Sequence, residues 1–123
     1  MNASAQDVHG IGMIKASDGG VQVLRANAPS AAVAGQRLMQ GDQLRTGDTG
    51  STTVMLRDGT VVALGPKSTV DLSRFQFNST TQEGSLGVKL VQGSIRMVTG
   101  LIAKLNPDAV MVETPTALIG VRG

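Results

Sequence analysis

The residues whose types could do acid–base or nucleophilic chemistry form no recognisable constellation in this sequence. His9 is the single histidine, and the chain of 123 residues contains no cysteine. General acid–base catalysis needs positioned groups with tuned pKa values, whereas the nine carboxylates are scattered without a close pair. Because no nucleophile, base and orienting group come together, we expect no catalytic residue and no enzymatic activity on other molecules.

Two loop carboxylates could instead bind a cation. Asp42 and Asp48 lie beside glycines in the stretch GDQLRTGDTGS, a setting in which calcium ligands also occur. The stretch lacks the dense alternating acidic residues and the distal glutamate of an EF-hand loop, so we expect these aspartates to cap their own turns. A thiolate zinc site is excluded because the chain has no cysteine. We therefore predict neither a metal site nor a cofactor.

The two aromatic residues, Phe75 and Phe77, stand two positions apart in the stretch RFQF. Side chains two apart share one face of a strand, so the pair either covers an end of the core or forms a platform for a ligand. Nucleic-acid binders concentrate positive charge and often add aromatic stacking, but here the eleven basic residues are spread singly, and Trp and Tyr are missing. We therefore expect no nucleic-acid partner.

The elements that must position these residues are short strands. Turn signals such as Asp58-Gly59 recur along the chain, which contains 16 glycines. The segments between the turns are rich in Val, Thr, Ile and Leu, which pack well in strands and lose rotamer freedom in helices. We therefore predict an all-β protein. Residues 100–105 (GLIAKL) are expected to form either a short helix that ends before Pro107 or a buried strand.

A repeated triplet gives the spacing of three of these strands. Val-x-Leu recurs at intervals of eight residues, about five of strand and about three of turn, in VMLRDGTVVALGPKSTVDL. Because alternate side chains share a face, each Val and Leu pair should point into the core. The spacing suits an antiparallel meander or successive rungs of a solenoid. The pairs are Val54 and Leu56, Val62 and Leu64, and Val70 and Leu72.

One domain accounts for the chain, because this length and a hydrophobic content of 41% suffice for a single core without disulfides. We place the domain at residues 9–123 and expect residues 1–8 to form a flexible tail. Ala3, Ser4 and Ala5 have the small-x-small form of a signal-peptidase site, so the tail is either the remnant of that junction or a plain alanine- and serine-rich segment. No run approaches the ~18 apolar residues of a membrane helix, and we expect no direct membrane span.

Several turn motifs follow one another in a recognisable order. Along the chain stand a Gly-Asp before a Thr-Gly turn, an Asp-Gly-Thr hairpin, Gly-Pro-x-Ser, a Gly-Ser-Ile turn, Thr-Pro and a closing Val-Arg-Gly. No single motif is specific, but their order makes residues 35–123 resemble the FecR domain, named for the ferric-citrate regulator of bacterial iron uptake. The resemblance implies a compact solenoid-like β fold, with an antiparallel β-sandwich or jelly roll as the alternative.

The resemblance also implies a function. FecR domains are periplasmic β-rich modules of anti-sigma regulators, lipoproteins and multidomain sensors. We therefore expect a periplasmic or exported, non-catalytic protein-interaction and sensory module in envelope signalling or scaffolding. The sigma-factor role is not carried over, because the sequence shows no transmembrane helix or cytoplasmic segment of the anti-sigma type. The alternative is a small-ligand or glycan-binding module with its pocket near Phe75 and Phe77.

The final stretch, TALIGVRG, has the alternation of a half-buried strand. We expect the domain to be truncated before a final strand, which leaves a sheet edge beside residues 116–123. An unpaired edge invites strand addition, so Ile119, Val121 and Arg122 are predicted to contact a protein partner or a second copy in a homodimer. Loops provide the other expected contacts with a partner.

The resemblance places a self-cleavage junction at Gly123. Some anti-sigma members of the family cleave themselves between a glycine at this position and a following threonine, by an acyl shift to the hydroxyl. The chain is then either the N-terminal product of self-cleavage or a sequence whose boundary was drawn there. We favour the boundary, because the threonine nucleophile is not in the sequence.

Overall fold

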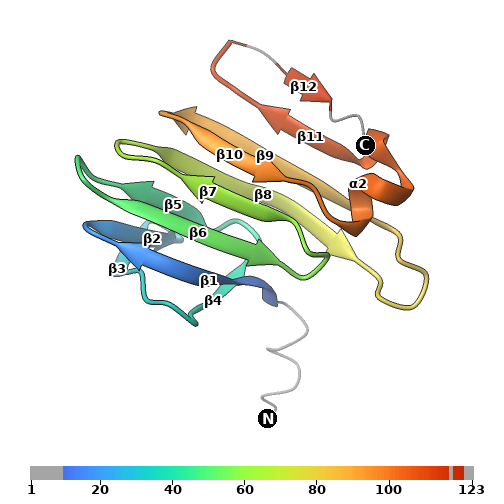
Figure 1. The fold of residues 1–123 in the computed structure, drawn as a ribbon, viewed down its shortest axis with the longest axis horizontal. Helices are drawn as coiled ribbons and strands as arrows, with labels where there is room; N and C mark the ends of the chain where they lie inside the picture. Colours follow the sequence, from blue (N-terminus) through green and yellow to red (C-terminus); the bar gives the residue numbers. More distant parts are fainter. Residues whose placement is uncertain (1–9, 117, 121–123) are drawn as a thin grey trace.

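The computed structural model describes residues 10–116 and 118–120, which form short strands joined by turns (Figure 1). This confirms the all-β prediction, and residues 101–105 form the short helix that was one of the two alternatives for that segment. No helix in the described residues has the length and apolarity needed to cross a membrane. The elements are β1 (Gly10–Asp18), β2 (Val21–Arg25), β3 (Ala28–Ala31), β4 (Arg37–Met39), β5 (Gln43–Thr46), β6 (Ser51–Leu56), β7 (Val61–Leu64), β8 (Thr69–Phe77), β9 (Gly84–Gln92), β10 (Ile95–Val98), α2 (Leu101–Leu105), the 3-10 helix η1 (Pro107–Ala109), β11 (Val110–Glu113) and β12 (Leu118–Gly120).

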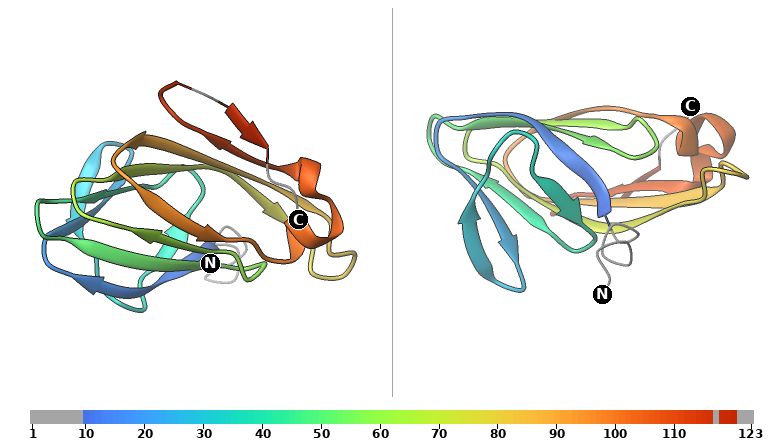
Figure 2. Two further views of the ribbon diagram at one scale, coloured as in Figure 1. Left: turned by 45° about the horizontal axis from the view of Figure 1, so that its top comes forward. Right: turned by 90° about the horizontal axis from the view of Figure 1, so that it is seen from below.

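The strands are divided between two sheets. The first sheet has five strands in the order β10-β7-β6-β1-β4, and the second sheet has seven in the order β12-β11-β9-β8-β5-β2-β3. Neighbouring strands in the described residues are antiparallel, apart from the parallel pair of β9 and β11. The right-hand view of Figure 2 shows the sheets as two layers, with α2 at one end.

The repeated triplet lines both sides of the space between the sheets. All six of its Val and Leu side chains are at most 2% exposed, as the alternation predicts. β6 and β7 form an antiparallel hairpin in the first sheet, with Val54 opposite Val62. β8 belongs to the second sheet, so the next step along the chain crosses from one layer to the other. The three copies of the triplet together therefore supply core residues to both sheets.

The buried side chains of the two sheets and of α2 form one apolar cluster. Such a cluster is the main source of stability in a domain without disulfides, because it removes apolar surface from water. Its members are Ile11, Ile14, Val23, Leu38, Leu44, Val54, Leu56, Val62, Leu64, Val70, Leu72, Phe75, Leu86, Val88, Ile102, Ala103 and Val110. The opposite face of each sheet is left for contacts outside the domain.

Candidate functional site

The Asp-Gly-Thr turn between β6 and β7 holds the start of α2. The Asp58 carboxylate is buried and accepts hydrogen bonds from the Thr60 N–H (3.0 Å), the Thr60 hydroxyl (2.9 Å) and the Ile102 N–H (3.2 Å). The Asp58 carbonyl accepts another from the Leu101 N–H (2.9 Å). The first N–H groups of a helix have no partner within it, and this turn supplies the missing acceptors. The Asp58 side chain is therefore engaged in holding the fold.

A second buried network joins the Thr-Gly, Gly-Pro-x-Ser and Gly-Ser-Ile motifs. The Thr46 hydroxyl donates to the Gly65 carbonyl (2.6 Å) and accepts from the Ser68 N–H (2.9 Å). The Ser68 hydroxyl accepts from the Ser94 N–H (3.0 Å) and lies 3.1 Å from the Ser94 carbonyl oxygen. These bonds join strand ends of the first sheet to strand ends of the second. The motif hydroxyls thus connect the two layers.

Asp42 caps its own turn, as predicted, and also pairs with a distant arginine. Its carboxylate accepts from the Met39 N–H (2.8 Å) and from Nε (2.9 Å) and one terminal nitrogen (2.8 Å) of Arg25. Asp42 is 1% exposed whereas the Arg25 side chain is 54% exposed. The hydrogen bond to Asp42 and its charge raise the pKa of Arg25, against a smaller opposing effect of burial.

Asp48 is exposed, and the described residues contain no group of three or more metal-ligating side chains.

The two phenylalanines lie at one end of the core. The Phe75 ring is 4% exposed, with the Arg57 guanidinium 5.4 Å from its centroid and the Phe77 ring 6.5 Å away. Phe77 is only partly buried and lines an open hollow of about 710 Å³ beside the β8–β9 turn. An external ligand would therefore reach Phe77 more readily than Phe75.

The outward face of the first sheet carries an unusual row of side chains. The strand register places Arg37 opposite Met13, Met13 opposite Met55, Met55 opposite Val61, and Val61 opposite Val98. Residues directly opposite one another share a face, so this row runs across all five strands. Met13 is 47% exposed, Met55 36% and Val98 58%. We call Met13, Met55, Val61 and Val98 the apolar row.

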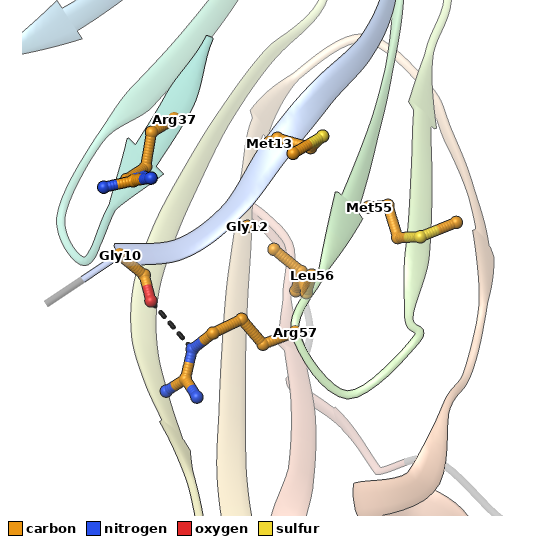
Figure 3. Close-up of a pocket in the computed structure, with 7 residues that line it drawn as sticks. All are labelled: Gly10, Gly12, Met13, Arg37, Met55, Leu56 and Arg57. Carbon is orange, nitrogen blue, oxygen red and sulfur yellow. Dashed lines mark hydrogen bonds between the residues drawn. The ribbon is translucent and has the colours of Figure 1, made fainter. Parts of the chain in front are cut away.

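A depression lies at the Arg37 end of the apolar row (Figure 3). It has a volume of about 470 Å³, and its lining includes Met13, Met55, Arg37 and Arg57. Arg37 and Arg57 lie on opposite sides of β1, and Arg57 Nε donates to the Gly10 carbonyl (2.8 Å). The depression thus combines two thioether side chains with two guanidinium groups. That combination suits an apolar group that carries a carboxylate.

The outward face of the second sheet is polar by comparison. Its register places Glu113 opposite Lys89, Lys89 opposite Asp71, and Asp71 opposite Gln43. The Gln43 side-chain amide donates to the Asp71 carboxylate (2.6 Å). Alternating charges and amides of this kind are typical of a solvated sheet face. The two outward faces of the molecule therefore differ in chemistry.

The predicted edge strand is present in part. β12 pairs with β11, with Ile119 opposite Val112, and it is the outermost strand of the second sheet among the described residues. Val121, Arg122 and Gly123 lie outside the described residues, so the predicted contacts of the first two and the self-cleavage junction at the third stay predictions. At the other edge of this sheet, β3 contains Pro29 and is exposed along its length.

Comparison with known proteins places the chain in a family. The family model described as "FecR protein" matches residues 42–123. The chain belongs to the FecR family. The FecR match includes the Asp58 turn and the network of Thr46, Ser68 and Ser94, so the resemblance of the turn motifs is confirmed.

Among solved structures, one titled "Cell surface anchoring domain" is similar to this FecR chain. The identity is 35%, the match covers 50% of this chain and 83% of that one, and the TM-score is 0.48. No curated protein matches the chain.

Sequence reasoning missed the apolar row, although a signal for it was present. A strand with one solvated face alternates apolar and polar residues. β7 (VVAL) is instead apolar at every position, and β1 and β6 place Met13 and Met55 at outward positions. The sequence did not reveal that these positions align, because the alignment depends on pairing between β1 and β6, which are far apart in the chain.

Proposed function

We propose that this FecR domain is a non-catalytic protein-interaction and sensory module of the bacterial cell envelope, located in the periplasm. The observation that carries the proposal is the apolar row, in which Met13, Met55 and Val98 are exposed on one face of the first sheet. Contiguous exposed apolar surface on a soluble domain is typical of interaction sites. Membership of the FecR family supports the envelope location.

Affinity capture tests this proposal. The exported chain is used as bait against the solubilised envelope of the bacterium that encodes it, and the retained proteins are identified by mass spectrometry. An exported β-domain of similar size serves as the control bait. A protein that is retained by this chain alone is the expected result, whereas an identical set on both baits contradicts the proposal.

A small-ligand or glycan-binding function is the second candidate. The hollow beside Phe77 favours it, because that hollow also presents Asn78, Thr81 and Glu83 as hydrogen-bonding side chains. A ligand that binds only the folded state raises the unfolding temperature. A thermal-shift screen of sugars and metabolites should then give a rise that is lost in Phe77→Ala. No rise with any compound would remove this candidate.

Edge pairing through β12 would make the domain a homodimer. Because β12 pairs with β11 on one side, its other side is the place where a second chain would add a strand. Sedimentation equilibrium should then show a dimer that Ile119→Pro weakens, since proline cannot donate to a strand ladder. A strict monomer at high concentration would contradict edge pairing.

Self-cleavage after Gly123 is tested separately. The natural reading frame that contains this sequence is expressed and purified under denaturing conditions, and its intact mass is measured. If a threonine follows Gly123, self-processing predicts two fragments that disappear when that threonine is replaced by alanine. A single full-length mass would rule out processing at this junction.

A further inference from the structure

We infer that the outward face of the first sheet binds a protein segment in which apolar side chains are flanked by carboxylates. This inference rests on the proposed interaction function and names the chemistry of the partner. Two properties of the same face carry it: the apolar row, and the positive charge that surrounds the row.

The apolar part of the surface is continuous and adaptable. The row places one outward-facing apolar side chain on each of β1, β6, β7 and β10, in direct cross-strand register. The side chains on β1, β6 and β10 are exposed, and Val61 on β7 is half-buried. Its two methionines have flexible, polarisable side chains that fit apolar partners of varied shape. The depression of about 470 Å³ at the end of the row can receive one larger apolar side chain of the partner.

The charged part of the surface is positive. The five strands of the first sheet contain Lys15, Arg37 and Arg96, and Arg57 follows β6 directly. Asp18, at the end of β1, is the one carboxylate that these strands carry.

The position of these cations relative to the row indicates what they could bind. Lys15 lies at the bulge of β1. Arg96 is opposite Ala63, two residues along the strands from the pair of Val98 and Val61 and therefore on the same face. Within the described residues Lys15, Arg57 and Arg96 form no ion pair with a carboxylate of this chain. Complementary charge therefore favours a partner with carboxylates on both sides of its apolar residues.

Other occupants fit this face less well. Segments that bind the membrane interface use Trp or other bulky apolar anchors, and this chain has no Trp or Tyr. A second copy would present the same cations, and like charges across an interface oppose association. A protein segment with the opposite charge satisfies both the apolar row and the cations.

Matched variants test the surface. Met55→Glu with Val98→Glu places two carboxylates on the apolar row. Met111→Glu with Val91→Glu does the same at exposed strand residues of the second sheet, where Met111 is 36% exposed and Val91 40%. A second pair compares Lys15→Glu with Arg96→Glu against Arg45→Glu with Lys89→Glu on the second sheet. Circular dichroism and the unfolding midpoint establish that each variant is folded.

The probe is a synthetic peptide of alternating leucine and glutamate, titrated into isotope-labelled protein while methyl signals are recorded. We expect shifts at Met13, Met55, Val61 and Val98, and binding weakened about tenfold or more, ~1.4 kcal/mol, by either substitution pair on the first sheet. The pairs on the second sheet should leave affinity unchanged. The same peptide with lysine in place of glutamate should not bind.

Several outcomes would overturn the inference. Equal binding of the lysine peptide would show that charge does not determine binding. Absence of shifts with the glutamate peptide would show that this face is not the binding site. Binding to phosphatidylglycerol vesicles without peptide binding would assign the face to a membrane. Methyl shifts that depend on protein concentration alone would assign it to a second copy.

The affinity capture separates this inference from the proposed function. If the Met55→Glu, Val98→Glu bait retains the same partner as the unmodified bait, the inference fails and the interaction function stands. If the unmodified bait retains no partner, the proposed function itself fails. The third outcome is that only this variant loses the partner and that cross-linking maps the contact to a segment of the partner with apolar residues and carboxylates. In that case both the inference and the proposed function stand.

Discussion

Single polar residues in the turns determine how distant parts of the chain meet. Asp58 belongs to a hairpin turn, yet its carboxylate accepts the Ile102 N–H from a helix 44 positions away. Asp42 caps its own turn and also receives the guanidinium of Arg25. The local part of each arrangement follows from the preference of aspartate for turns. The distant partners depend on the tertiary fold, and for that reason the sequence did not indicate them.

Asp58→Ala should destabilise the domain substantially. The substitution removes the acceptor of three hydrogen bonds and leaves the buried Ile102 and Thr60 N–H groups without it. Unsatisfied buried donors cost about 1–3 kcal/mol each, so we expect the free energy of unfolding to fall by ~2–4 kcal/mol. Urea unfolding followed by far-UV circular dichroism measures the change.

Asp108→Ala is the control for this prediction. Asp108 is an exposed aspartate of η1, and its replacement should change the free energy of unfolding by no more than ~0.5 kcal/mol. Equal effects of the two substitutions would show that the Asp58 carboxylate does not hold α2.

Arg25→Met should leave the buried Asp42 carboxylate without its cation. Removing one partner of a buried pair is costly, but the Arg25 side chain is 54% exposed and solvent screens the pair. We therefore expect a loss of only ~1–2 kcal/mol in urea unfolding. Arg25→Lys keeps the charge without the two-pronged contact and should lose less. A larger loss for lysine than for methionine would contradict a charge-based role.

The pH dependence of this contact follows from the sign of the pKa shift. The hydrogen bond to Asp42 raises the pKa of Arg25 above its ordinary value. A raised pKa in the folded state gives stability that is present below the unfolded value and is lost only as the pH rises through the folded value. The difference in stability between wild type and Arg25→Met that arises from Arg25 ionisation should therefore stay constant between about pH 6 and 9.

At the scale of elements, the hairpin of β6 and β7 packs so closely on the start of α2 that the helix needs a glycine there. A Cβ at position 100 would lie 2.6 Å from the Thr60 nitrogen and 2.8 Å from the Gly59 carbonyl carbon, and closer still to the Asp58 carbonyl oxygen. These are backbone atoms, which cannot move aside as a flexible side chain can. The approach therefore requires a residue without a side chain.

Gly100→Ala should consequently displace α2 from the hairpin and lower the free energy of unfolding by about 1–3 kcal/mol or more, as overpacking against rigid neighbours does. Gly20→Ala is the matched control, because a Cβ at position 20 meets nothing within 4 Å. Urea unfolding of the two variants gives the comparison. If Gly100→Ala is as stable as Gly20→Ala, the close approach is not required.

The elements show which structural features a sequence of this kind can predict. The spacing of Val and Leu predicted three inward-facing strands, and the structure confirms them, because alternation is a local property. The parallel pairing of β11 with β9 and the crossing from β7 to β8 between sheets were not predicted. These features depend on contacts between distant segments. The apolar row shares this dependence, since it appears only when β4, β1, β6, β7 and β10 are in register.

At the scale of the whole molecule, the two sheets share one core but differ on their outward faces. The first sheet presents the apolar row with surrounding cations, and the second presents alternating charges and amides. Stability therefore depends on the inward faces, whereas the recognition that we propose uses one outward face. Substitutions on the apolar row should then alter partner binding while the unfolding midpoint changes little.

The shared core leads to a prediction about cooperativity. Leu64→Ala removes core contacts from the first sheet and Leu72→Ala from the second, and both side chains are at most 2% exposed. Because their neighbours belong to one cluster, each substitution should lower the stability of the whole domain by ~2–5 kcal/mol in a single transition. Far-UV circular dichroism and the methyl signals of both sheets should give the same midpoint. If Leu64→Ala unfolded the first sheet while the methyl signals of Val70 and Val88 in the second stayed native, the second sheet would have to be stable without the first. In that case the turn network of Thr46, Ser68 and Ser94 would join two separate units rather than close a single core.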